Sequence, residues 1–383
     1  MNDMSWAPPG PPPQPVPPPM PVAFSGSRTQ FFRLVARGAG LELFTVGFYR
    51  FWLTTDIRRH LWSNTLIDGD GAEYTGRGKE LLIGFLVALA ILVPVYLGYA
   101  LLVIEAEHGQ TFSSLPMVAF FYVFGQFAIY RARRYRLTRT VWRGVRFWMS
   151  GSGWIYALKA SLWGLLVVIT LGFALSWREA ALERYKMRHS HYGDLRGDFE
   201  GRGWEFFKQA WYLWLIAPFA ILLFPLLPFV YAQFKAVEWR WWLSGIRFGG
   251  VRLESSLPVN AFHGLYWKVI GWFILLSLVY VIYLGTVIAL GTSLLGLGKD
   301  GLPQAQALAT QMLLVVAMVP GYIALILAVN VVMRLYLVRD MWAVALDSVR
   351  VYGIEAMANV AAKGDLASAL GEGFADGLDV AGF

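Results

Sequence analysis

The chain contains no cysteine, which excludes disulfide bonds, thiolate metal ligands and a cysteine nucleophile. Charge is also scarce: 15% of the residues are charged, whereas a soluble domain carries roughly 25%. No Gly-x-Ser-x-Gly or His-Glu-x-x-His motif occurs, and the Gly-x-Gly sequences at 76–78 and 201–203 lack the Lys-Ser/Thr pair of a phosphate-binding loop. The sequence therefore offers no catalytic, cofactor-binding or metal-ligating residue, and we expect no cofactor.

Apolar residues dominate what is present. They make up 57% of the chain, and the mean hydropathy is +0.50. A helix needs about 20 apolar residues to cross a hydrocarbon core about 30 Å thick. Six runs have no charged residue, which predicts an all-α polytopic membrane protein with about six transmembrane helices: 81–104, 109–130, 160–177, 209–234, 269–298 and 301–333.

Three segments leave alternatives open. Run 160–177 is short for a span. Run 209–234 contains Pro218, Pro225 and Pro228, so it is either one kinked span or a helix–turn–helix that enters and returns. A seventh segment, 31–52, carries Arg33, Arg37 and Glu42, and we expect a re-entrant or interfacial helix there rather than a span.

An internal repeat spaces matching residues 125 positions apart (170 − 45 = 125), without a gap. Thr45-Val-Gly-Phe recurs as Thr170-Leu-Gly-Phe, and Gly76-Arg-Gly as Gly201-Arg-Gly. Further identical pairs are Trp52/Trp177, Arg59/Arg184 and Glu80/Glu205. The pattern indicates a duplicated membrane unit with copies at about 31–130 and 156–255, followed by a C-terminal helical hairpin at 264–340.

The ends of the chain differ from this membrane domain of residues 28–363. Residues 1–27 include a proline-rich run and predict a disordered cytoplasmic tail. Residues 364–383 are small and acidic and predict a flexible tail. No basic segment precedes an apolar one near the start, so we expect no cleavable signal peptide.

Orientation follows from the basic residues. Segment 130–149 contains seven arginines and no acid, whereas the loop 105–108 between the first two spans has no lysine or arginine. The arginine-rich linker is therefore expected in the cytoplasm of a bacterial inner membrane, with both termini on the same side. The side of segment 178–208 is ambiguous. Either the two copies are inverted in the membrane, or segments 31–52 and 160–177 are re-entrant, 209–234 is a hairpin, and every charged linker is cytoplasmic.

Basic, tryptophan-bearing helices leave several membrane segments. Tryptophan at a helix end favours the headgroup layer, where a guanidinium also reaches phosphate. Anchoring explains most of these residues; a site for anionic lipid headgroups or a protein partner is the sharper hypothesis. The candidate binding residues are Arg59, Trp62, Glu80, Arg139, Trp142, Arg184 and Glu205.

Two polar clusters are better explained as loops. His189-Ser-His191 with Asp194 has ligand-type side chains but no evident fourth ligand, so a solvated loop is expected. Asp68-Gly-Asp70 is typical of a turn. We expect no bound metal, and the basic excess of one linker is a topology signal rather than a nucleic-acid signal.

Several of these motifs resemble the YjgN-like (DUF898) family of bacterial inner-membrane proteins. The similar segments are Thr-Val-Gly-Phe-Tyr-Arg-Phe-Trp at 45–52, Glu73-Tyr-Thr-Gly-Arg-Gly-Lys-Glu80 and the closing Gly371-Glu-Gly-Phe-Ala-Asp-Gly-Leu-Asp379. Ala72-Glu73 stands where the family usually has Phe-Glu. The resemblance covers about residues 28–379. It implies a multi-pass membrane protein without an established activity, and it supplies no catalytic residues.

Three functions remain. The favoured one is a non-enzymatic scaffold, or a protein that binds lipid headgroups or a partner, including a second copy of the chain. The alternative is a transporter or channel-like protein with inverted repeats, suggested by the duplication and the proline-broken run. A membrane enzyme is the third, supported only by the weak Asp and His clusters. The substrate and the oligomeric state are not encoded in any motif.

Overall fold

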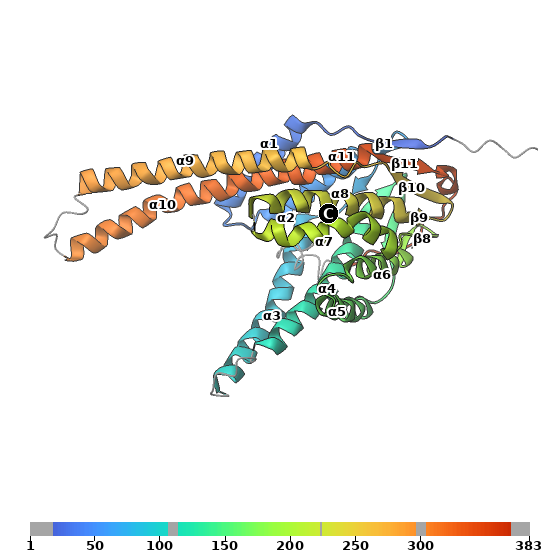
Figure 1. Cartoon of the computed structure of the whole chain (residues 1–383), viewed down its shortest axis with the longest axis horizontal. Coiled ribbons are helices and arrows are strands. Elements are labelled where there is room, and N and C mark those ends of the chain that lie inside the picture. Colours follow the sequence, from blue (N-terminus) through green and yellow to red (C-terminus); the bar gives the residue numbers. More distant parts are fainter. Residues whose placement is uncertain (1–17, 106–113, 223, 296–303, 369–383) are drawn as a thin grey trace, which may run out of the picture.

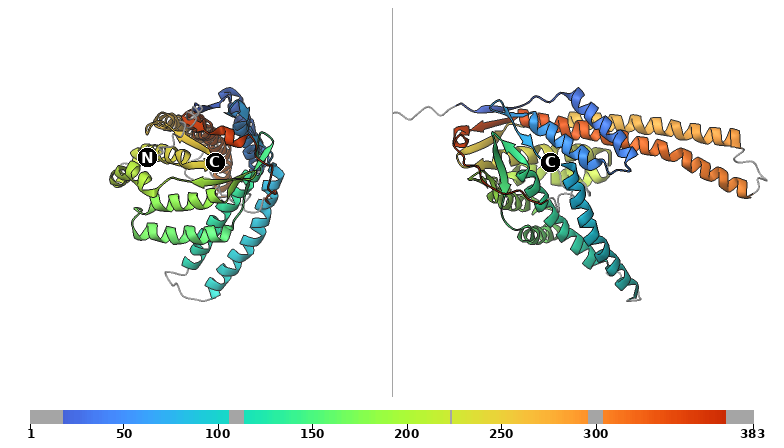
Figure 2. Two further views of the ribbon diagram at one scale, coloured as in Figure 1. Left: turned by 90° about the vertical axis from the view of Figure 1, so that its right-hand side faces the viewer. Right: turned by 180° about the vertical axis from the view of Figure 1, so that it is seen from behind.

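The computed structural model describes residues 18–105, 114–222, 224–295 and 304–368. A base of helices and a sheet carries two long helical hairpins that project from it in different directions (Figures 1 and 2). One hairpin is α3 (Gly78–Glu105) with α4 (Leu115–Thr138), and the other is α9 (His263–Leu295) with α10 (Gln304–Met333). The sheet lies at the end of the base opposite to the α9–α10 hairpin (Figure 1).

The remaining helices form the base. They are α1 (Arg28–Phe44), α2 (Arg50–Ser63), α5 (Gly153–Ile169), α6 (Leu175–Arg188), α7 (Gly203–Leu222), α8 (Leu227–Gly245) and α11 (Met341–Asp347). Two short 3₁₀ turns, Phe224–Leu226 and Ile354–Met357, and a π-helical stretch, Arg334–Asp340, complete the helical part. The predicted C-terminal hairpin at 264–340 corresponds to α9, α10 and the π-helical stretch.

Four helices are long and apolar enough to cross a membrane in the described part of the chain: Gly78–Ile104, Leu115–Thr138, His263–Gly291 and Met312–Asp347. The prediction of six is therefore not met. Run 160–177 belongs to the shorter apolar helix α5 and the turn that follows it. Run 209–234 is a helix–turn–helix, because the prolines of the 224–228 segment separate α7 from α8.

The prediction of an all-α fold is wrong. Eleven short strands form one sheet in the order β3-β2-β1-β11-β10-β9-β8-β7-β6-β5-β4, with every neighbouring pair antiparallel. They are β1 (Met20–Phe24), β2 (Thr65–Ile67), β3 (Asp70–Gly71), β4 (Glu73–Tyr74), β5 (Thr140–Trp142), β6 (Val145–Met149), β7 (Ser190–Tyr192), β8 (Leu195–Phe199), β9 (Ile246–Phe248), β10 (Val251–Ser255) and β11 (Val349–Tyr352). β1 lies within the segment predicted to be a disordered tail; residues 1–17 of that tail and 369–383 of the other lie outside the described residues.

The sheet nearly closes into a ring, because its two edge strands, β3 and β4, are separated in the chain by a single residue, Ala72. Arg143 joins the edges: its Nε lies 2.6 Å from Asp70 and its Nη2 lies 2.6 Å from Asp68. Trp142 adds a hydrogen bond from Nε1 to the Asp70 carbonyl oxygen, 3.3 Å long. The aspartates of Asp68-Gly-Asp70 thus belong to a turn and bind an arginine.

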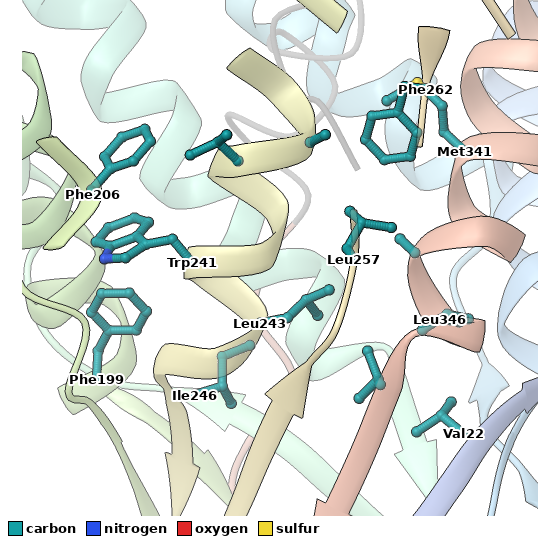
Figure 3. Close-up of a cluster of buried hydrophobic side chains, with 14 of the residues drawn as sticks. Val22, Phe199, Phe206, Trp241, Leu243, Ile246, Leu257, Phe262, Met341 and Leu346 are labelled. Carbon is teal, nitrogen blue, oxygen red and sulfur yellow. The ribbon is translucent and has the colours of Figure 1, made fainter. Parts of the chain in front are cut away.

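Aromatic side chains hold the base helices to the sheet. Trp241 of α8 lies between Phe199 of β8 and Phe206 of α7, with ring centroids 5.0 and 4.8 Å apart (Figure 3). The same buried cluster continues through Leu243 and Leu257 toward α11 (Figure 3). Fully burying one such side chain stabilises the fold by about 1.5–3 kcal/mol.

Candidate functional site, an arginine-lined pocket

The repeated Thr-x-Gly-Phe sequences build two helical hairpins with the same turn. In both copies the threonine hydroxyl, Thr45 or Thr170, donates to the carbonyl oxygen four residues earlier, at 2.8 Å. The threonine hydroxyl oxygen in turn accepts the backbone N–H of the residue four positions after the threonine, at 2.9 and 3.0 Å. The next residues, Val46 and Leu171, have φ of 51° and 50°, and a glycine follows each. The motif therefore reverses the chain between α1 and α2, and between α5 and α6.

The repeated arginines and glycines hold each hairpin to the next helix. The Arg59 guanidinium donates to the Gly76 carbonyl oxygen at 3.3 Å, and that of Arg184 donates to the Gly201 carbonyl oxygen at 3.2 Å. A Cβ atom on the glycine that begins α3 or α7 would lie 2.8 Å from a tryptophan Cα in either copy. Part of the repeat is thus explained by packing, with no ligand required.

In the first copy, the predicted residues Glu80 and Arg139 bind each other. Arg139 Nη2 lies 2.6 Å from a Glu80 carboxylate oxygen, which also accepts the Tyr135 hydroxyl at 2.8 Å. Burial lowers the pKa of Arg139, but its bonds to Tyr135 and Glu80 outweigh burial and raise it. The Glu80 carboxylate is therefore already bound by an arginine and a tyrosine of the same chain.

The second copy is open at the corresponding place. A pocket of about 870 Å³ lies beside the N-terminus of α7, and the predicted residues Arg184 and Glu205 both line it. Glu205 is exposed and has no hydrogen-bond or ion-pair partner among the described residues. We call this the arginine pocket, after its five arginines: Arg184, Arg188, Arg202, Arg240 and Arg247.

Only part of the positive charge of the arginine pocket is neutralised. Its lining has three acids, so five arginines leave a net charge of +2 (5 − 3 = 2). Arg188 pairs with Asp198 at 3.0 Å and Arg247 with Glu200 at 2.8 Å.

The other three arginines of the pocket have no carboxylate within ion-pair distance in the described chain. Arg184 binds a backbone carbonyl oxygen, Arg240 donates to the Gln209 side chain at 2.7 Å, and Arg202 is exposed. Free backbone N–H groups of the first turn of α7 add positive potential. The arginine pocket therefore suits an anion such as a phosphate ester.

The other predicted residues lie elsewhere. Trp62 donates from Nε1 to the Thr140 hydroxyl at 2.9 Å and stacks on Trp342, while Trp142 is buried against the ring closure. Neither these nor Arg59 lines the arginine pocket. Sequence reasoning missed Arg188, Arg202, Arg240 and Arg247. The Arg202 of Gly201-Arg-Gly203 was the available signal, because it lies beside the repeated glutamate.

A second cavity of about 400 Å³ lies where α2, α4, α6, α8 and α11 meet, and Trp62 is the one predicted residue that lines it. We call it the tryptophan cavity, after Trp62, Trp239, Trp241, Trp242 and Trp342. Its wall contains the buried Glu183, which binds Arg133 at 2.9 Å, Lys186, and the Trp242 Nε1–H at 3.2 Å.

Electrostatics distinguish two carboxyl groups of the tryptophan cavity. Burial raises the pKa of Glu183, but Arg133 and Lys186 outweigh burial and lower it to about 2. Burial raises the pKa of Glu179 despite its contact with Arg178. Glu183 is thus a fixed anion that joins α6 to α4 and α8.

The side chains of the predicted histidine cluster make hydrogen bonds and ring contacts within the protein. His189 Nδ1 lies 2.7 Å from the Tyr185 carbonyl oxygen, His191 stacks on Trp148 at 4.1 Å, and Asp194 accepts a backbone N–H. Burial lowers the pKa of His191. Among the described residues no group of three potential metal ligands comes together.

Among the described residues, four helices are long and apolar enough to cross a membrane, which suggests a membrane protein whose helical hairpins are joined to a nearly closed antiparallel sheet. No curated protein and no solved structure matches it. The model of a family described as "Bacterial protein of unknown function (DUF898)" matches residues 19–238, more than half of the chain. The chain belongs to this family.

Proposed function

We propose that this protein is a non-enzymatic platform on the cytoplasmic face of the bacterial inner membrane, and that its arginine pocket binds a phosphate-bearing anion, foremost a lipid headgroup. The observation that carries the proposal is the open pocket itself. Three of its arginines contact no carboxylate, whereas the matching place in the first copy is filled by Glu80, Arg139 and Tyr135. A charged guanidinium binds phosphate oxygens more strongly than a neutral donor does.

The neighbouring hairpin supports a lipid source for the phosphate. The α5–α6 turn exposes apolar side chains, with Leu171 89% exposed, and the α1–α2 turn does the same, with Val46 88% exposed. Such surface is costly in water and stable in hydrocarbon. Arg184 follows Trp177 on α6 by seven residues, so it lies about 10 Å farther from the apolar tip than Trp177 does. With the apolar tip in hydrocarbon, Arg184 lies on the headgroup side of Trp177.

The continuous sheet supports a one-sided arrangement. Strands from every charged linker pair with one another, from β2–β4 through β5–β6 and β7–β8 to β9–β11. Open sheet edges do not cross a lipid core, because their backbone groups have no partner there. All linkers then lie on one side, and α1–α2 and α5–α6 enter the membrane and return. We infer further that the two matched hairpins arose by duplication.

Binding is tested with two soluble probes, inorganic phosphate and dihexanoyl phosphatidylglycerol, against dihexanoyl phosphatidylcholine. The purified full chain is titrated in a mild detergent by calorimetry. We expect phosphatidylglycerol to bind at least about tenfold more tightly than phosphatidylcholine, since each charge-assisted bond contributes about 1.5–3 kcal/mol. Tighter binding of phosphate than of phosphatidylglycerol would instead identify a free anion as the ligand.

The matched variants are Arg202→Gln in the arginine pocket and Arg59→Gln in the first copy. Arg202→Gln removes an exposed guanidinium, so we expect a loss of affinity with an unchanged melting temperature. Arg59 makes the same backbone contact as Arg184 but does not line the pocket, so Arg59→Gln keeps the affinity. Equal binding of both lipids, or equal losses in both variants, contradicts the proposal.

The transporter alternative is favoured by one observation, the tryptophan cavity at the meeting point of five helices. With inverted copies, the two charged linkers would face opposite sides. Single cysteines at the exposed positions Glu73 and Arg196, in a chain without native cysteine, test this with an impermeant maleimide. Labelling of both only after cell lysis supports the one-sided platform. Labelling of one in intact cells supports the transporter.

A further inference from the structure

A long apolar groove follows the α9–α10 hairpin. Its first part, about 740 Å³, lies between α1, α9 and α10. Its second part, about 440 Å³, lies between α9 and α10 farther from the base. Leu276 and Ala328 line both parts, so the two parts adjoin each other along α9 and α10.

The length of the groove fits one acyl chain. Along α10 it runs from Leu335 to Pro320, which at 1.5 Å per residue is about 22 Å. One leaflet of a hydrocarbon core about 30 Å thick is about 15 Å deep. The groove therefore covers the whole depth of a leaflet, and a chain lying along it stays in contact with protein from its first carbons to its end.

Small residues open the groove and an aromatic residue fixes its far end. The groove is lined by the small residues Ala36, Ala39 and Gly40 of α1 and by Ala328 of α10. Their short side chains leave space between the two helices. At the far end, Pro320 has no N–H for the helix ladder, and the Tyr283 hydroxyl donates to the nearby Ala317 carbonyl oxygen at 2.5 Å. This bond holds the Tyr283 ring between α9 and α10, so the far end of the groove has a defined shape.

The near end of the groove is polar and cationic. Arg28 lies there, 4.7 Å from the centre of the Tyr336 ring, and the Tyr336 hydroxyl accepts the Trp272 Nε1–H at 3.2 Å. Arg28 pairs with Asp340 at 3.1 Å, yet 46% of its side chain remains exposed. Lys268 is exposed one turn before Trp272 on α9. A tryptophan with two exposed cations is the arrangement found at the level of lipid phosphates.

We propose that this groove binds one anionic phospholipid, with an acyl chain along α9 and α10 and the phosphate near Arg28 and Lys268. The charge of the near end selects the headgroup, and the apolar length selects the chain. The bound lipid fastens α1 to the α9–α10 hairpin, since all three helices contact it. The site is separate from the arginine pocket, because the two share no lining residue.

Native mass spectrometry of the full chain, purified in mild detergent and supplied with equal phosphatidylglycerol and phosphatidylcholine, tests the proposal. In the Arg202→Gln background, which weakens the arginine pocket, we expect one phospholipid retained per chain, with phosphatidylglycerol favoured at least about fivefold. Ala328→Phe fills the point where the two parts join and lowers retention at least about tenfold. Ala90→Phe, on an exposed face of α3, is the matched control and retains the lipid.

The variant Arg28→Gln tests recognition of the headgroup separately from binding of the acyl chain, because it does not fill the groove. We expect this variant to retain lipid while losing the preference for phosphatidylglycerol. Equal retention by Ala328→Phe and Ala90→Phe overturns the groove as the site, and an unchanged preference in Arg28→Gln overturns its headgroup end. All groove variants carry Arg202→Gln as well, so failure of this proposal is distinct from failure of the arginine pocket.

Discussion

Replacing Glu183 by glutamine tests whether the buried ion network holds the base together. The side chain of Glu183 is 10% exposed, and those of its partners Arg133 and Lys186 are 18% and 12% exposed. Glutamine keeps the volume and can still accept the Trp242 hydrogen bond. It leaves two buried cations without a counter-charge.

The expected cost follows from that burial. Removing one partner of a buried ion pair costs about 3–5 kcal/mol, because the remaining charge is uncompensated. A chain of this size loses about 2 °C of melting temperature per kcal/mol, so Glu183→Gln is expected to melt about 6–10 °C lower. Glu254→Gln is the control. Its carboxylate is 51% exposed and lies 4.0 Å from Arg252, and such a pair contributes about 0–1 kcal/mol.

Thermal unfolding of the detergent-purified variants, followed by size-exclusion chromatography after heating, measures the difference. The double variant Glu183→Gln/Lys186→Met removes one of the two unpaired cations, so we expect it to melt above the single variant. A single variant that melts within 2 °C of Glu254→Gln, or a double variant that melts lower than the single one, refutes the reasoning about buried charge.

Three further predictions concern the same fold. The pKa of Glu183 in the folded chain is about 2, below the usual value of about 4.3. The ionised carboxylate therefore stabilises the fold above about pH 4, and this effect is lost as the pH falls toward 2. The melting curves of the wild type and Glu183→Gln should converge at low pH. Gly203→Ala places a Cβ 2.8 Å from the Trp177 Cα and should cost about 1–3 kcal/mol in a melting assay, whereas Gly264→Ala, with open space around it, should not. Arg143→Ala releases the two aspartates of the β2–β3 turn and should speed amide hydrogen exchange in β2–β5 while barely changing the melting temperature, since the Arg143 side chain is 35% exposed.

The strands were missed because the apolar runs dominate the pattern. Each strand is short, and six of the eleven are three residues or fewer. Alternation in Val145-Arg-Phe147 and Ile246-Arg-Phe248 was present in the sequence, but a three-residue alternation does not separate a strand from the end of a helix. What stabilises these strands is pairing with strands far away in the chain, such as β1 with β11.

The prediction of six spans is not confirmed for a related reason. Length and lack of charge predict a span, and 160–177 and 209–234 satisfy both in part. Whether such a helix crosses the membrane depends on the elements that it packs against. α5 packs along α4 and ends at the Thr170 turn, and α7 returns through α8.

The sequence by itself determined that the chain is rich in apolar segments long enough for membrane helices, that two segments match at a spacing of 125 residues, and that Glu80, Arg139, Arg184 and Glu205 are candidate binding residues. Periodicity and composition act locally, so they are readable along the chain. The tertiary structure alone decided that Glu80 is occupied while Glu205 is free, because Arg139 and Tyr135 reach the first and no equivalent pair reaches the second among the described residues. It also decided the ring of strands and the arginine pocket, since both depend on groups that are distant in sequence and meet only in the folded chain.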